Sequence, residues 1–232
     1  MTGKVAVVTS ACQDIGVGLV AGYRRRGWAV VASARAIGPS EDPDVLTVAG
    51  DIANFETADR IIGGALERFG RIDTLVNNAG RFISKPFTDY TADDYALAVG
   101  VNLTGFFWLI QRAIAEMATR YGGHVVNITT ALPEVTDSGT PAVLPALTNG
   151  GLTAATRSLA NEYASYGIRV NAVSPGIQPS AHPPDSHVSL GDRLPRVGGC
   201  QVSDVVDGVL LLESASYITG EILHIDGQTA GH

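Results

Sequence analysis

The sequence has little cysteine and no long apolar run. Only two cysteines, Cys12 and Cys200, occur among 232 residues, which excludes a disulfide-stabilised scaffold. No basic segment followed by an apolar stretch marks a signal peptide, and no apolar run approaches the roughly 20 residues that span a bilayer. We therefore expect a cytoplasmic protein that does not enter a membrane.

Basic residues are also scarce. The 16 lysines and arginines are outnumbered by 23 aspartates and glutamates, for a net charge of -7. The one cluster, Arg24 to Arg26, reads as the solvated end of a helix, so we expect no nucleic-acid partner. Two histidines, His182 and His187, lie close together without a third ligand at metal spacing, and we predict no metal site.

What is present is a series of short, valine-rich apolar runs. The first, at 4–10, is too short for a helix and is bounded by polar residues, which is typical of a buried strand. A helical pattern at 15–26 and a second strand at 28–34 complete a β-α-β unit. Further strands are predicted at 44–50, 73–80, 124–130, 168–176 and 221–227. The pattern predicts a Rossmann-type, doubly wound parallel α/β sheet formed by one domain, residues 1–232.

Two connecting segments depart from this regular alternation. Residues 35–44 contain two prolines and a glycine, so we expect a loop where a crossover helix would otherwise lie. Residues 177–199 carry four prolines and follow the carboxyl end of a predicted strand. Ligands bind at such ends, so we predict that this segment is a lid over a small-molecule substrate.

Motifs at the predicted strand ends resemble those of the short-chain dehydrogenase/reductase family over essentially the full length. The run 77–80 is similar to the family's NNAG, Asp51-Ile52 to its adenine-contacting pair, and Ser174-Pro175-Gly176 to the turn beside the nicotinamide. Asn102 matches the helix asparagine that anchors a proton-relay water in the family. The resemblance implies a nicotinamide site and a small-molecule substrate.

The family's catalytic positions, however, are changed. The resemblance places Pro145, Asn149 and Thr130 where the family has a tyrosine, a lysine and a serine, and no tyrosine lies between Tyr121 and Tyr163. A tyrosine needs a neighbouring cation to lower its pKa, and Asn149 carries no charge. The remaining candidates for catalysis are Thr130, Asn102 and the carboxylates Glu134 and Asp137.

The phosphate loop is changed as well. The family's glycine-rich pattern appears as "TSACQDIG", Thr9 to Gly16, in which Ser10 and Asp14 replace two glycines. The Asp14 carboxylate would repel a diphosphate, or would cap the helix that follows. Arg35, directly after Ala34, instead favours a 2′-phosphate and hence NADP(H). The resemblance assigns cofactor contacts to Thr9, Gly16, Arg35, Asp51, Ile52, Asn78, Ala79, Gly80, Pro175 and Gly176.

Two functions remain open. The first is a protein that has lost hydride transfer and acts on or binds a small molecule without redox chemistry, as a cyclase, dehydratase, isomerase or accessory subunit, with weak or absent nicotinamide binding. The second is an NADP(H)-dependent reductase whose proton donor is a water held by Asn102 and Thr130. Apolar residues on the predicted helices around 106–118 and 152–164 also favour a homodimer or homotetramer.

Overall fold

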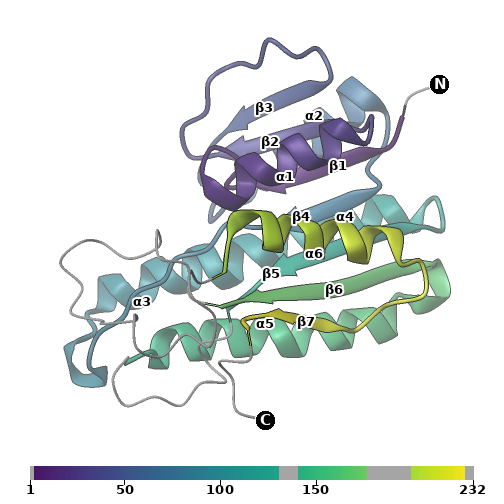
Figure 1. Cartoon of the computed structure of the whole chain (residues 1–232). Coiled ribbons are helices and arrows are strands. Elements are labelled where there is room, and N and C mark those ends of the chain that lie inside the picture. Colours follow the sequence, from purple (N-terminus) through teal and green to yellow (C-terminus); the bar gives the residue numbers. More distant parts are fainter. Residues whose placement is uncertain (1–2, 131–140, 177–199, 228–232) are drawn as a thin grey trace.

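A computed structural model describes residues 3–130, 141–176 and 200–227, which form a seven-stranded, entirely parallel sheet covered by helices on both faces (Figure 1). The strand order is β3-β2-β1-β4-β5-β6-β7. The strands are β1 Val5–Thr9, β2 Ala29–Ala34, β3 Val45–Ala49, β4 Thr74–Asn77, β5 Gly123–Ile128, β6 Ile168–Pro175 and β7 Ile222–Ile225. The predicted fold class and all seven predicted strands are confirmed.

The helices follow the strands in the expected alternation. They are α1 Asp14–Arg25, α2 Phe55–Phe69, α3 Ala92–Val99, α4 Phe106–Ala118, α5 Val143–Glu162 and α6 Val202–Ser214. Two 3₁₀ turns, Phe87–Asp89 and Ala164–Tyr166, and a π-helical segment, Gly100–Gly105, complete the described elements. As predicted, β2 and β3 are joined by a loop without a helix.

Side-chain alternation along the strands builds two hydrophobic cores. In β1, Val5 and Val7 face the core shared with α2 and α4, whereas Ala6 and Val8 face the core shared with α1 and α6. All five residues of β1 are buried, which explains why the strand reads as a continuous apolar run. The strand order reverses beside β1, between β2 and β4, and the carboxyl ends of strands diverge at such a point to leave a ligand crevice.

A buried polar network joins the opposite, amino ends of the strands. The Glu213 Oε2 atom on α6 accepts hydrogen bonds from Thr74 at 2.7 Å and from Tyr23 at 3.2 Å, and lies 3.1 Å from His124 Nδ1. His124 Nε2 faces two donors, Asn171 at 3.0 Å and Arg169 at 3.3 Å. Because Nε2 must accept, the proton lies on Nδ1 and His124 is neutral.

The environment of His124 keeps that ring neutral. Burial lowers the pKa of His124, and the Arg169 cation acts in the same direction against the opposing effect of Glu213. The network therefore holds β4, β5, β6 and α6 together through a histidine that resists protonation.

Among the residues that the structure describes, one helical stretch, Ala92–Ala118, is long and apolar enough to cross a membrane by length and composition alone. It contains α3, the π segment and α4, and five residues of α4, including Leu109, Ile110 and Met117, are buried in the core. Its apolar character is thus that of a helix covering the sheet.

Candidate functional site

A pocket of about 340 Å³ lies at the carboxyl ends of β1, β2 and β4, at the reversal of strand order. Five residues predicted to bind a cofactor line it: Arg35, Asp51, Ile52, Ala79 and Gly80. Further lining residues are Gln13 in the turn after β1, Arg81 in the segment after β4, and Leu97 and Val101 in the helical stretch opposite. The sequence reasoning had not singled out these four.

The turn after β1 keeps the geometry of a glycine-rich loop although two glycines are absent. Ser10 and Asp14 have φ values of 51° and 39°, in the left-handed region that glycine adopts most easily. The remaining glycine is needed for space, because a Cβ on Gly16 would lie 2.0 Å from the Ser10 carbonyl oxygen. The turn thus adopts the backbone conformation that glycines would adopt, at some cost in backbone strain.

The prediction that Asp14 caps α1 is wrong. The N-cap residue is Gln13, whose side chain makes no capping hydrogen bond, and Asp14 is the first helical residue. Its carboxylate is exposed in the first turn, where it interacts favourably with the helix dipole. The charge stands next to Gln13, which lines the pocket.

Thr9 and Asn78 tie the pocket's strand ends together. The buried Thr9 hydroxyl accepts hydrogen bonds from the backbone N–H groups of Asn78 and Ala79, both at 2.9 Å. The Asn78 side chain donates to the Thr9 and Ser10 carbonyls at 3.2 and 3.4 Å. These two predicted cofactor residues fix β4 against β1 and do not themselves line the pocket.

Asn102 makes a comparable connection between the segment after β4 and helix α5. Its side chain is 4% exposed and lies in the π-helical segment. Asn102 Oδ1 accepts from the Arg81 N–H at 2.7 Å, and Nδ2 donates to the Arg81 carbonyl at 2.9 Å and to Thr148 Oγ1 at 3.1 Å. The amide thereby holds the chain after β4 against α5. Its predicted part in proton relay stays a prediction.

Helix α5 carries the residues that replace the expected acid and its cation. Pro145 is the third residue of the helix, where a missing N–H costs little, as the sequence predicted. Asn149 Nδ2 donates back to the Pro145 carbonyl at 3.0 Å, so this amide is engaged within its own helix. Neither side chain can supply a proton from an ionisable group.

The other predicted residues fall in three places. Thr130 is half-buried two residues beyond β5, and it stays a candidate for catalysis. Pro175 is the last residue of β6 and Gly176 follows it. The Gly176 N–H donates to the Ile225 carbonyl of β7 at 2.8 Å, and neither residue lines the pocket. Glu134, Asp137 and the 177–199 segment lie outside the described residues.

No group of three or more histidine, cysteine, aspartate or glutamate side chains that could hold a metal ion occurs within 3–130, 141–176 and 200–227. His182 and His187 lie outside these ranges.

The chain resembles known oxidoreductases along its whole length. Residues 6–228 match the family described as enoyl-(acyl carrier protein) reductase. The 1,6-dihydroxycyclohexa-2,4-diene-1-carboxylate dehydrogenase of Pseudomonas putida is 33% identical over 99% of this chain and 93% of its own. Oxidoreductase UcpA of Escherichia coli is 30% identical over 98% of this chain and 94% of its own. The crystal structure of a short chain dehydrogenase from Bacillus anthracis superposes with a TM-score of 0.86 at 26% identity, covering 99% and 97% of the two chains.

These similarities correct two expectations. The preference for a non-redox enzyme or an accessory protein is contradicted, because the relatives are named as dehydrogenases, reductases and oxidoreductases. The expectation of weak or absent nicotinamide binding, with no cofactor favoured, is not supported either, since the fold and the family are compatible with NAD(P). The retained strand-end motifs indicate the function of the relatives correctly, although Pro145 and Asn149 stand where the family has Tyr and Lys.

Proposed function

Since the chain belongs to the short-chain dehydrogenase/reductase family, we propose that it is an oxidoreductase that exchanges a hydride between NADP(H) and a small hydroxy or carbonyl compound. The observation that carries the choice of NADP(H) is Arg35, which directly follows β2 and lines the pocket behind the small, buried Ala34. A guanidinium suits a 2′-phosphate, whereas an acidic residue here would suit the free ribose hydroxyls of NAD.

The pocket residues fit the other parts of the nucleotide. Asp51, Ile52, Leu97 and Val101 offer a partly apolar wall of the kind that accepts adenine, and the small Ala79 and Gly80 leave room for the ribose. The retained turn after β1 brings the chain to the start of α1, where the diphosphate binds in such folds. All of the wall and ribose residues named above except Ile52 are half-buried or exposed, so they remain accessible to a ligand.

When bound, the nicotinamide supplies a hydride to the carbonyl carbon in the reductive direction, and one proton must then reach the carbonyl oxygen. We propose that the Thr130 hydroxyl hydrogen-bonds that oxygen and that a water bonded to Thr130 donates the proton, since Pro145 and Asn149 cannot. The carbonyl becomes an alcohol, and the water is restored by a proton from solvent. General acid catalysis by a tuned side chain is worth about 10²- to 10⁴-fold, so turnover should be slow for the family.

The substrate class follows from the same chemistry. The relative from P. putida is named for a cyclic diol carboxylate, so we propose cyclic or short secondary alcohols and the matching ketones as the first compounds to test. Oxidation of a panel of such alcohols with NADP⁺, followed at the absorbance of the reduced nicotinamide, tests the activity. Thr130→Val should lower kcat by tenfold or more, and Asn149→Ala should leave it within about twofold, because its amide is bonded to its own helix.

Cofactor choice is tested by titrating the protein with NADPH and NADH. We expect NADPH to bind at least tenfold more tightly, and Arg35→Ala to remove that preference. Arg25→Ala is the matched control, because Arg25 is an exposed arginine at the other end of α1. Failure of both nucleotides to bind at millimolar concentration, or equal affinity for the two, would contradict the proposal.

A further inference from the structure

Two arginines enter the nucleotide pocket from the ends of different strands. We infer that Arg81, after β4, is a second cation for the 2′-phosphate and acts together with Arg35, after β2. The inference rests on the proposed use of NADP(H) and adds a residue that determines specificity.

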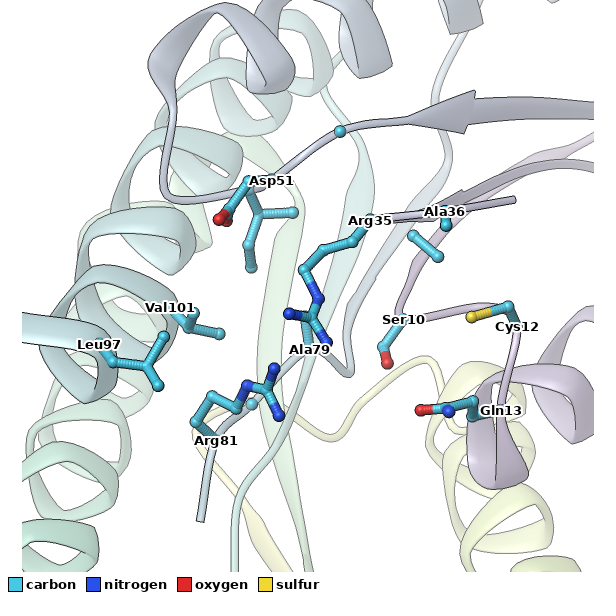
Figure 2. A pocket seen from close by; sticks show the side chains of 14 residues that line it. Ser10, Cys12, Gln13, Arg35, Ala36, Asp51, Ala79, Arg81, Leu97 and Val101 are labelled. Atoms are coloured by element: carbon cyan, nitrogen blue, oxygen red, sulfur yellow. The ribbon is translucent and has the colours of Figure 1, made fainter. Parts of the chain in front are cut away.

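The first support is the direction of the two side chains. Figure 2 shows the guanidinium groups of Arg35 and Arg81 pointing toward one another within the pocket. Neither forms an ion pair with any carboxylate in the described parts of the chain. Two like charges that face one another raise the energy of the free protein, and an anion placed between them removes that repulsion.

The second support is the fixed backbone of Arg81. Both of its backbone polar groups are bonded to the buried Asn102 amide, at 2.7 and 2.9 Å, and that amide is in turn bonded to Thr148 on α5. The starting point of the Arg81 side chain is therefore set by groups outside the pocket. A side chain on a fixed backbone loses less freedom when it binds a ligand.

The third support is the charge that must be matched. A phosphate monoester carries about −1.5 to −2 charges at neutral pH, and one guanidinium neutralises only part of it. The other ionisable side chains of the pocket are Cys12 and Asp51, and Asp51 Oδ1 accepts from the Ala53 N–H at 3.0 Å. Counted against the Asp51 carboxylate, the two arginines leave the pocket one positive charge, whereas Arg35 alone would leave it none with which to attract a phosphate.

The two arginines could instead bind the cofactor's diphosphate, whose chemistry is similar to that of the 2′-phosphate. Two fragments of the cofactor distinguish these two possibilities. Adenosine 2′,5′-bisphosphate carries the 2′-phosphate without a diphosphate, and ADP carries the diphosphate without the 2′-phosphate. Calorimetric titration of both should be made with the full-length protein and with Arg81→Ala, Arg81→Lys, Arg35→Ala and the control Arg25→Ala.

We expect Arg81→Ala to weaken the bisphosphate about 10- to 100-fold and to leave ADP within about twofold. Arg81→Lys should recover part of the loss, because lysine keeps the charge but not the planar fork. The melting temperature of Arg81→Ala should be unchanged, since Asn102 bonds the backbone of residue 81 and not its side chain.

The outcomes separate this inference from the proposed function. If Arg81→Ala keeps full affinity for the bisphosphate while Arg35→Ala loses it, the use of NADP(H) stands and the role of Arg81 is refuted. Equal weakening of both fragments would assign Arg81 to the diphosphate and would also refute it. If the unaltered protein binds neither NADPH nor the bisphosphate, both proposals fail.

Discussion

Asp14→Asn should strengthen NADPH binding, and the gain should fall as salt is added. Asp14 stands as an exposed first residue of α1, at the helix end where the diphosphate binds in this fold. In the proposed complex with NADPH, this carboxylate would compete with the diphosphate for the positive end of the helix dipole and would repel it. Removing an exposed charge at such a position changes a binding constant by about two- to fivefold at low ionic strength.

The choice of asparagine separates charge from backbone strain. Asp14 has φ of 39°, and asparagine tolerates this left-handed conformation about as well as aspartate does. Ser10→Gly makes the opposite change, because it relieves the strain at φ of 51° without altering charge. That relief, roughly 1–2 kcal/mol, is offset by the roughly 0.5–1 kcal/mol of extra chain entropy that glycine brings to the unfolded state.

The assay is fluorescence titration with NADPH at about 0.01 M and 0.15 M salt, where the screening length falls from about 30 to about 8 Å. We expect Asp14→Asn to bind more tightly at low salt and to approach the unaltered protein at high salt. Ser10→Gly and the control Glu67→Gln, an exposed residue in the last turn of α2, should show no salt-dependent gain. An unchanged dissociation constant for Asp14→Asn at low salt would show that the carboxylate does not face the phosphates.

Three further predictions concern the loop, the buried histidine and assembly. Gly16→Ala should abolish NADPH binding and lower the melting temperature, because the added Cβ would lie 2.0 Å from the Ser10 carbonyl oxygen; normal binding would refute this packing role. Burial holds the pKa of His124 below its value in the unfolded chain, so the unfolded chain takes up the proton first as the pH falls. The free energy of unfolding should therefore decrease below about pH 6.5, by up to about 1.4 kcal/mol per pH unit. Urea unfolding of His124→Gln should show a shallower acid slope, and an unchanged slope would assign the loss to other groups. Sedimentation should detect a dimer or tetramer, since Phe107 and Leu147 are 54% and 62% exposed, and a monomer at micromolar concentration would reject this.

The fold was predictable because its determinants are local. Each strand is a short apolar run bounded by polar residues, and β1 is buried over all five residues, as its valine-rich sequence indicates. The proline-containing segment 35–44 forms a loop for the same local reason, since proline and glycine oppose a helix. Pro145 sits in the first turn of α5, as its lack of an N–H required.

The site was only partly predictable because its determinants are distant in sequence. Arg81 lies directly after the NNAG run, yet the bonds that fix its backbone come from Asn102, 21 residues away. The role of Thr9 depends likewise on N–H groups about 70 residues further on. The prediction that Asp14 is a cap rested on its residue type alone. The helix begins at Asp14, one residue before the predicted start, so Asp14 lies in the first turn.

The bonds between Asn102 and residue 81 have a consequence for which substitutions this chain can accept. Asn102 grips the N–H and the carbonyl of residue 81, groups that every amino acid except proline offers in the same form. Nineteen amino acids could therefore be exchanged at this position without loosening the chain after β4. A substitution at residue 81 can therefore change the charge of the pocket without changing the backbone around it. The ligand preference of the pocket can change while the fold is kept.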